Sequence, residues 1–248
     1  MKIVKLQENL LQYIIAAPTE SKTGLNFFVL LNGSKALLID AGYRRECKMV
    51  LDDLSSRGIF VVKVIPSHFH PDHVEGILLI DKPEVYGNSY AQQTLSMFYD
   101  EDAVKQMSPT HIINDDTTVS FGGFELSFAS APGHSDCTML IIINNKYVHI
   151  GDLYIRKDTG EDILPFVKWA NVQQHLKSLN MLLEYGDKEF LISHGFCPIS
   201  FAELSRGIKD RNIYLSALLD SNNTVSGQDA VKDCSKPFSF MHWREFVK

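Results

Sequence analysis

The chain contains the run Ser67-His68-Phe69-His70-Pro71-Asp72-His73, in which three histidines and one aspartate occupy four of six consecutive positions. Neutral imidazole and carboxylate groups are common ligands of zinc and similar first-row metals. His68 and His70 alternate at the end of an expected strand, so both side chains can point to one side. Asp72 and His73 follow at the turn into an expected helix and can face a second point. One short loop can therefore supply two neighbouring metal positions, unless it is only a solvated histidine-rich loop.

Three more candidate ligands follow apolar runs that are typical of β-strands. His134 lies in Pro-Gly-His, Asp152 in Gly-Asp and His194 in Ser-His-Gly. Short apolar runs that end at glycine or proline indicate a strand followed by a loop. Loops held by a rigid sheet are where functional side chains concentrate, so a metal site is the stronger interpretation. The other four histidines lack this context, and we expect them to be structural or on the surface: His111, His149, His175 and His242.

The periodicity of apolar residues predicts two sets of strands, each accompanied by helices. Strands are expected at 2–6, 12–17, 25–31, 35–40, 60–66, 110–113, 117–121, 124–130, 137–143, 146–150 and 189–193. Helices are expected at 44–57, where Gly58 provides a stop signal, and at 74–80, 88–107 and 171–185. This order suits an α/β fold with two packed sheets and helices on the outside.

The motifs HxHxDH, PGH, GD and SHG, in this order, resemble those of the metallo-β-lactamase superfamily of dinuclear metal hydrolases. The segment Lys35-Ala36-Leu37-Leu38-Ile39-Asp40-Ala41-Gly42 is similar to the family's strand that ends in Asp and Gly. The resemblance covers roughly residues 25 to 200, and five motifs in the correct order are far more specific than any one of them. It implies a four-layer αββα sandwich with the metals at one edge.

The resemblance also implies how the metal ligands are divided. One metal would be held by His68, His70 and His134, and the other by Asp72, His73 and His194, with Asp152 bridging the two. The cofactors implied are two divalent ions, with Zn²⁺ favoured; imidazole ligands also accept iron or manganese. Two such ions, about 3.5–4 Å apart, can share a hydroxide and stabilise a developing oxyanion.

Three residues near the predicted ligands have further expected roles. Asp72 could orient the nucleophile as well as bind a metal. Asp40 is expected to fix a ligand imidazole from behind, although it could equally be a turn residue before Gly42. Tyr154 is a candidate catalytic hydroxyl because lactonases of this superfamily place a tyrosine nearby. They usually place it three residues after the aspartate, whereas Tyr154 is two residues after Asp152.

These expectations favour a dinuclear hydrolase of a small ester, lactone or thioester, and several alternatives stay open. β-Lactamase activity is disfavoured because those enzymes typically have Cys or Ser where this chain has Asp152. Glyoxalase II shares all seven ligand types, but its glutathione-binding domain is not recognisable in residues 199–248. A persulfide dioxygenase of the same superfamily would use one iron, and a phosphodiesterase or nuclease is a further alternative. A non-catalytic binding protein is disfavoured by the complete ligand set.

Length and composition limit the remaining possibilities. The chain has 248 residues, 45% of them hydrophobic and 22% charged, and no linker or repeat divides it. We expect a single metallo-β-lactamase-like domain over 1–248, with a helical C-terminal tail from about 199. The formal net charge of −6 argues against a nucleic-acid partner. The four cysteines lack metal-ligand spacing.

The sequence also favours a cytoplasmic protein that acts on a small molecule. The apolar stretch near residue 10 is interrupted by polar side chains and is too short for a signal peptide. No stretch is long enough to span a bilayer, so no membrane association is expected. The sequence does not decide the oligomeric state, and a homodimer is one option.

Overall fold

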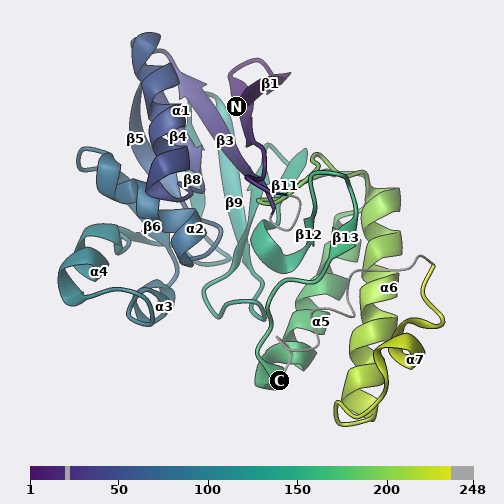
Figure 1. Cartoon of the computed structure of the whole chain (residues 1–248). Helices are drawn as coiled ribbons and strands as arrows, with labels where there is room; N and C mark the ends of the chain where they lie inside the picture. Colours follow the sequence, from purple (N-terminus) through teal and green to yellow (C-terminus); the bar gives the residue numbers. More distant parts are fainter. Residues whose placement is uncertain (20–22, 236–248) are drawn as a thin grey trace.

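The computed structural model describes residues 1–19 and 23–235, and in it two β-sheets lie face to face (Figure 1). The first sheet has seven strands in chain order: β1 (Lys2–Gln7), β2 (Leu10–Ile15), β3 (Leu25–Asn32), β4 (Lys35–Ile39), β5 (Phe60–Ile65), β6 (Glu84–Gly87) and β7 (His111–Ile112). The second sheet has five strands in the order β14 (Glu189–Leu191), β11 (Tyr147–His149), β10 (Met139–Ile143), β9 (Phe124–Ser130) and β8 (Thr118–Phe121). A short hairpin pairs β12 (Ile155–Arg156) with β13 (Asp162–Ile163).

The pairing in the first sheet changes from antiparallel to parallel after β4. Strands β2, β3 and β4 pair antiparallel, whereas β4 and β5 are parallel. A parallel connection needs a crossover, and helix α1 (Arg44–Ser56) provides it. The chain leaves this helix at Gly58, whose φ of +69° favours a residue without Cβ. The helix predicted over 44–57 is therefore confirmed.

Strand β3 is apolar on both faces because it is covered on both sides. Phe28 and Leu30 are buried between the two sheets, while Phe27 and Val29 are buried on the opposite face, against α1. Helices α5 (Val172–Met181) and α6 (Phe201–Asp220) cover the second sheet, on the side opposite α1 (Figure 1). The layers are thus helix, sheet, sheet and helix. This order confirms the predicted α/β fold with a four-layer αββα sandwich.

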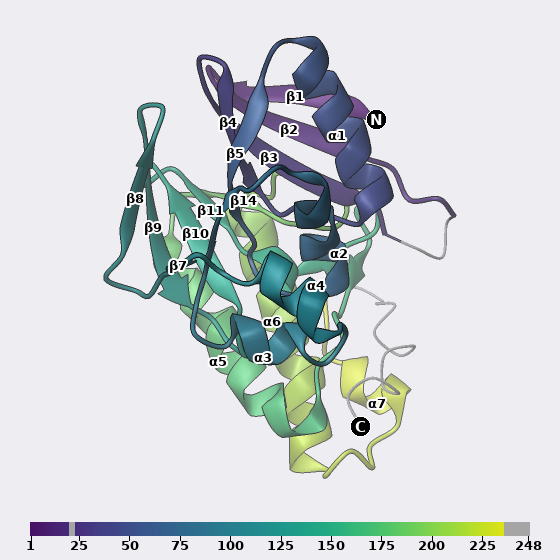
Figure 2. The same ribbon diagram turned by 90° about the vertical axis from the view of Figure 1, so that its left-hand side faces the viewer.

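Two predicted helices have a different form in the structure. The helix expected over 74–80 is a short α2 (Pro71–Val74) followed by a 3₁₀ turn, η1 (Glu75–Leu79). Gly76 in this turn packs so closely that an added Cβ would lie 2.1 Å from the Ala41 carbonyl oxygen. The segment 88–107 contains two helices, α3 (Ala91–Leu95) and α4 (Glu101–Met107), because Asp100 caps α4 and starts a new helix. Helices α2, α3 and α4 lie together beside the sheets (Figure 2).

The described part of the predicted tail, 199–235, contains two helices. Helix α6 begins with a capping box, in which Ser200 and Glu203 satisfy each other's free backbone N–H groups. Helix α7 (Gly227–Val231) follows and packs on α6. The part of the predicted tail in 236–248 lies outside the described residues, as does His242. Within the described part of the chain, no helix combines the length and apolarity needed to cross a membrane.

Candidate metal centre

Every predicted metal ligand lies in a loop, a turn or a short helix at one edge of the two sheets. His68 and His70 follow β5, and Asp72 and His73 lie in α2. The other three ligands follow strands of the second sheet: His134 after β9, Asp152 in the 3₁₀ turn η2 (Gly151–Leu153) after β11, and His194 after β14. The fold brings all seven together in two groups, within each of which the ligand atoms lie within 4.8 Å of one another.

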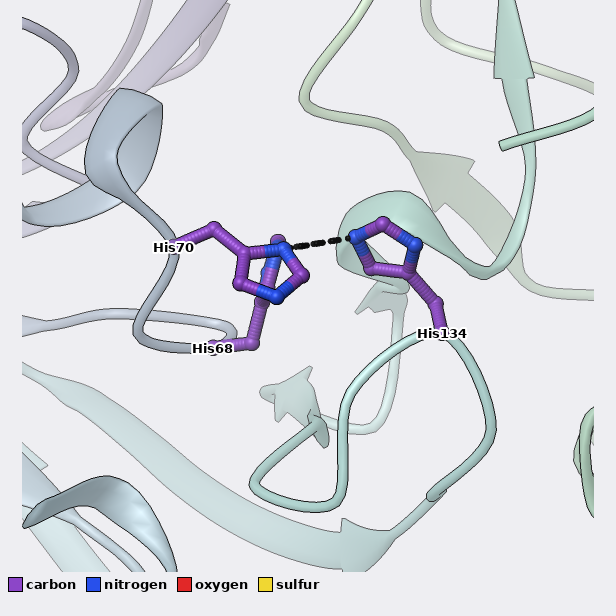
Figure 3. Close-up of side chains that lie close together, drawn as sticks. All are labelled: His68, His70 and His134. Carbon is purple, nitrogen blue, oxygen red and sulfur yellow. Dashed lines mark hydrogen bonds between the residues drawn. The ribbon is translucent and has the colours of Figure 1, made fainter. Parts of the chain in front are cut away.

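The first group consists of three imidazoles (Figure 3). Nδ1 of His70 lies 3.0 Å from Nε2 of His68 and 2.9 Å from Nε2 of His134, and the last two atoms are 3.2 Å apart. Nitrogens that share one tetrahedral zinc at about 2.0–2.1 Å lie roughly 3.3 Å from each other. The three nitrogens therefore fit one metal ion.

The environment keeps these three imidazoles neutral, as metal ligands must be. Burial and the neighbouring imidazoles lower the pKa of His70 to about 3. The same causes lower the pKa of His68 well below its usual value. Burial also lowers the pKa of His134, although Asp152 opposes this effect.

The second group combines two carboxylates and two imidazoles. Nε2 of His194 lies 3.3 Å from Oδ2 of Asp72 and 3.4 Å from Oδ2 of Asp152. Nε2 of His73 lies 3.5 Å from Oδ1 of Asp152, and neither atom has a hydrogen-bond partner among the described residues. Buried polar atoms without partners are costly, and a cation between them would satisfy both. This donor set also fits a metal ion.

The charges in the second group are strongly coupled. Burial raises the pKa values of Asp72 and Asp152, but His73 and His194 outweigh it, so both values fall below the usual range. Conversely, burial lowers the pKa of His194, but Asp152 and Asp72 outweigh it and raise that pKa to about 10. The neighbouring carboxylates of Asp72 and Asp152 therefore favour a positive charge between them, and a bound metal ion would supply that charge.

Asp152 lies between the two groups. Its Oδ2 is 3.4 Å from Nε2 of His194 in the second group and 3.8 Å from Nε2 of His134 in the first. The carboxylate is buried, in a turn that Gly151 enters with φ of +51°. An added Cβ on Gly151 would lie 2.7 Å from Oγ of Ser67. The close approach of these two backbone segments sets the position of Asp152.

The Nδ1 atoms of three ligands are held by partners outside the two groups. Nδ1 of His73 lies 3.0 Å from Oδ2 of Asp40, Nδ1 of His134 lies 2.6 Å from the Phe166 carbonyl oxygen, and Nδ1 of His194 lies 3.0 Å from the Gly24 carbonyl oxygen. Such partners favour a proton on Nδ1. The lone pair on each Nε2 is then free to bind a metal.

Asp40 lies at the centre of a buried hydrogen-bond network behind His73. It accepts bonds from the backbone N–H of Ser67 at 2.7 Å and from Oγ of Ser193 at 2.7 Å. Nε2 of His149 lies 3.6 Å from the same carboxylate. The sequence pointed to Asp40 but not to Ser67, Ser193 or His149, because nothing local signals that their strands converge.

The structure places Tyr154 outside the two ligand groups. Its side chain is fully buried, and its hydroxyl donates to Oδ2 of Asp162 at 2.9 Å. The guanidinium of Arg211 lies 3.4 Å from the centre of its ring. This hydroxyl proton is engaged by Asp162, so we do not include Tyr154 in the proposed reaction.

A cavity of about 400 Å³ opens onto both ligand groups. Three ligands reach it, namely His70, Asp72 and His134. Its other walls come from the α3 region and from the segments 135–136 and 166–171; they include Thr94, Met97, Phe98, Ser135, Asp136, Phe166, Lys168 and Asn171. Three of these lining residues, Thr94, Met97 and Phe98, belong to the segment 88–107.

Two features together define the class of this protein. It is an αββα sandwich, and it has two groups of His and Asp side chains, a candidate metal site, at one edge of its sheets. The Metallo-beta-lactamase superfamily model matches residues 23–194, and the chain belongs to that superfamily. Its members are generally metal-dependent hydrolases. The family match and the two ligand groups confirm the predicted family.

Solved structures of this superfamily are similar to the chain in fold. Metallo-beta-lactamase IND-7 aligns with a TM-score of 0.70 at 19% identity, covering 85% of this chain and 97% of that one. A metallo-beta-lactamase from Pontibacter korlensis has a TM-score of 0.68 at 16% identity, with 84% and 97% covered. A metallo-beta-lactamase family protein from Thermus thermophilus has a TM-score of 0.63 at 18% identity, with 88% and 82% covered. At these identities the similarity establishes the fold alone.

Proposed function

We propose that the protein is a dinuclear metal-dependent hydrolase that acts on a small ester, lactone or thioester. The observation that supports this most directly is the pair of ligand groups, with the buried carboxylate of Asp152 within 4 Å of both. In this proposal His68, His70 and His134 hold one ion, Asp72, His73 and His194 hold the other, and Asp152 bridges them. We favour Zn²⁺, which accepts both imidazole and carboxylate ligands.

The bound ions would supply Lewis-acid activation of a water molecule and of the substrate carbonyl group. The protein would contribute the positions of the reacting groups. Asp72 borders the cavity, and its side chain is 24% exposed. It can therefore accept a hydrogen bond from the attacking water and take its proton. That proton then passes to the alkoxide or thiolate that leaves when the C–O or C–S bond breaks.

The cavity supports a small substrate. Its volume of about 400 Å³ lies within the range of small-molecule sites. A nuclease would need a broad basic surface, whereas this cavity contains one lysine and two aspartates. We therefore keep phosphodiester hydrolysis only as an outcome of the substrate screen.

The principal alternative is a mononuclear iron oxygenase of the same superfamily that oxidises persulfides. Two histidines and one carboxylate with open positions are typical of such iron sites, and His68, His134 and Asp152 could form one. We favour the dinuclear hydrolase because the second group would still have three ligands if Asp152 were counted with the first. These three are Asp72, His73 and His194, and their ligand atoms lie close to one another.

Metal analysis combined with a substrate screen tests the proposal. The protein would be purified without added metal, and its metals counted by mass spectrometry. It would then be tested on a lactone, a thioester, an aryl ester, a phosphodiester and a chromogenic cephalosporin. We expect two ions per chain, and hydrolysis of a carbonyl substrate that stops with a chelator and returns with Zn²⁺. One iron per chain, with oxygen consumption on a persulfide and no hydrolysis, would contradict the proposal.

A further inference from the structure

We propose that Lys168 binds a carboxylate of the substrate, so that the cavity takes a monoanionic acyl compound with an apolar body. This inference rests on the proposed function, since it names the kind of ester, lactone or thioester that the site would accept. Three features of the cavity support it. The cavity has an apolar wall, Lys168 has no carboxylate partner among the described residues, and the backbone beside Lys168 is hydrogen-bonded to the proposed ligand His134.

The apolar wall is formed by Met97, Phe98 and Phe166, whose exposed fractions are 53%, 48% and 41%. Large apolar side chains that stay exposed together in a concave site are typical of ligand-binding surfaces. The ring of Phe98 lies edge-on to the ring of His70, with 5.5 Å between their centroids. The wall thus begins at a metal ligand, where the acyl chain of a substrate would lie.

Among the described residues that line this cavity, Lys168 is the only lysine or arginine. Its Nζ lies 3.8 Å from Sδ of Met97, and a thioether is only a weak acceptor. Four other lysines pair with carboxylates, among them Lys48 with Asp52 and Lys157 with Glu161. Across 1–19 and 23–235, no carboxylate oxygen lies within 4.0 Å of Nζ of Lys168. Its ammonium therefore keeps donors for a ligand at the apolar wall.

The backbone on either side of Lys168 is attached to the site. Two residues earlier, the Phe166 carbonyl oxygen lies 2.6 Å from Nδ1 of the ligand His134. After it, the N–H of Asn171 donates to the Lys168 carbonyl oxygen at 2.8 Å, and the Asn171 side chain donates to Asp136 at 3.4 Å. The base of Lys168 is thus held at a set distance from the first ligand group. An anion bound to its ammonium would place the reacting carbonyl in a limited range of positions.

Lys168 gives the cavity one cation with which a single negative charge on the ligand can pair. Lys168 contributes one positive charge, and Asp136, which also lines the cavity, contributes a negative one. The other carboxylate of the cavity, Asp72, belongs to the second ligand group. A polyanion such as a nucleoside triphosphate would meet repulsion from Asp136, and the chain as a whole carries −6. A carboxylate on an apolar chain matches both the cation and the wall.

A matched pair of esters tests the inference. Mono-p-nitrophenyl glutarate carries a carboxylate where p-nitrophenyl valerate carries a methyl group. We expect the metal-loaded protein to have a higher kcat/KM for the glutarate. In Lys168→Met the glutarate-to-valerate ratio of kcat/KM should fall by about 10- to 100-fold, as expected for a charged hydrogen bond. Lys168→Arg should restore most of the ratio, and the control Lys48→Met, on the outer helix α1, should leave it unchanged.

A binding measurement separates this inference from the hydrolase proposal. Titration calorimetry would compare 4-phenylbutyrate with 4-phenylbutyramide on the metal-loaded protein and on Lys168→Met. We expect the carboxylate to bind more tightly, and most of that preference to be lost in the variant. A preference that Lys168→Met leaves unchanged would mean that the carboxylate binds the metals directly, and the inference would be wrong. Absence of binding by both compounds would also contradict it.

The two proposals can fail separately. Hydrolysis of both esters, with a ratio that Lys168→Met does not change, would leave the hydrolase standing and overturn the role of Lys168. Lys168-dependent binding of the carboxylate without hydrolysis of either ester would support the anion site and count against the hydrolase. Melting temperatures of the variants close to that of the parent would show that the fold is intact.

Discussion

Nδ1 of His73 lies 3.0 Å from Oδ2 of Asp40, and both side chains are buried. Burial raises the pKa of Asp40, but His73 outweighs it and lowers that pKa below its usual value, so the carboxylate stays ionised. An ionised carboxylate behind an imidazole fixes the orientation of the ring and makes its other nitrogen a better ligand. The buried network around Asp40 therefore holds the imidazole of His73 in place.

Asp40→Asn should weaken metal binding without removing a ligand. The amide has no charge and cannot accept bonds on both sides as the carboxylate does, so we expect metal affinity to fall about 10- to 100-fold. Competition with a chromophoric chelator would measure it. Asp53→Asn, which changes a carboxylate that bonds Tyr13 near the surface, is the control. Equal affinities in Asp40→Asn and the parent would contradict the role of Asp40.

Asp72→Ala and His73→Ala should abolish turnover while the fold remains. Both residues lie in the short helix α2, whose C-terminal hydrogen bond, from the Glu75 N–H to the Pro71 carbonyl oxygen, is made by backbone atoms. Initial rates in metal-replete buffer would be compared with circular dichroism spectra of the same samples. Residual rates near that of the parent would reject the assigned second group.

Asp152→Asn should reduce the metal content as well as the rate. The buried carboxylate lies within 4 Å of both ligand groups, and a neutral amide balances less of the charge of two divalent ions. We expect fewer than two ions per chain after dialysis, measured by mass spectrometry. Leu153→Met, a volume-conserving change at the next position, serves as the control. Two firmly bound ions in Asp152→Asn would argue against a bridging role.

Gly133→Ala should disturb the loop that carries His134. Gly133 has φ of +148°, and an added Cβ would lie 2.4 Å from Cα of His175. Gly58 also has positive φ, but nothing lies within 4 Å of its Cβ position. Gly58→Ala should therefore cost only about 1 kcal/mol of stability from backbone strain. Gly133→Ala should cost more and also weaken metal binding, as urea denaturation and chelator competition would show.

His175→Leu should stabilise the protein, and increasingly so at lower pH. Neither ring nitrogen of His175 has a hydrogen-bond partner among the described residues. Burial is the main cause that lowers its pKa from 6.5 to about 3. Between these two values the unfolded chain takes up a proton that the folded chain does not, so this residue lowers stability as pH falls from about 6.5 toward 3. Leucine cannot titrate and leaves no buried donor unpaired.

Urea denaturation of parent and His175→Leu at pH 7.5, 6.0 and 5.0 would measure the effect. The difference in free energy of unfolding should grow in favour of the variant at each lower pH. His111→Leu is the comparison, because it makes the same change at an exposed histidine, beside Tyr86. A difference independent of pH would show that the folded protein protonates His175 as readily as the unfolded chain does.

Much of this site was predictable because its ligands lie in short local motifs. The segment directly after β5 carries His68 and His70 two positions apart and just before Pro71, so both side chains lie in one short stretch of the chain. Helix α1 was predictable for the same reason, since apolar spacing and a terminal glycine act within a few residues. The order of the motifs along the chain then indicated the family and, through it, the sandwich.

Only the tertiary structure shows which residues, distant in sequence, form hydrogen bonds to the candidate ligands or to the side chains behind them. Ser193 reaches Asp40 across 153 positions of sequence, and the Phe166 carbonyl reaches His134 across 32. Periodicity encodes which face of a strand is buried, but not which other strand it meets. Tyr154 shows the same limit: it follows Asp152 closely, yet the turn after β11 directs its hydroxyl to Asp162.

The sequence by itself thus indicated the candidate ligands, their order and the layered fold, because apolar periodicity and short motifs act locally. The tertiary structure decided the supporting network, the position of Tyr154 and the cavity in which Lys168 faces Met97. These depend on the packing of loops from different layers, and the energy of such packing is shared among residues far apart in the chain.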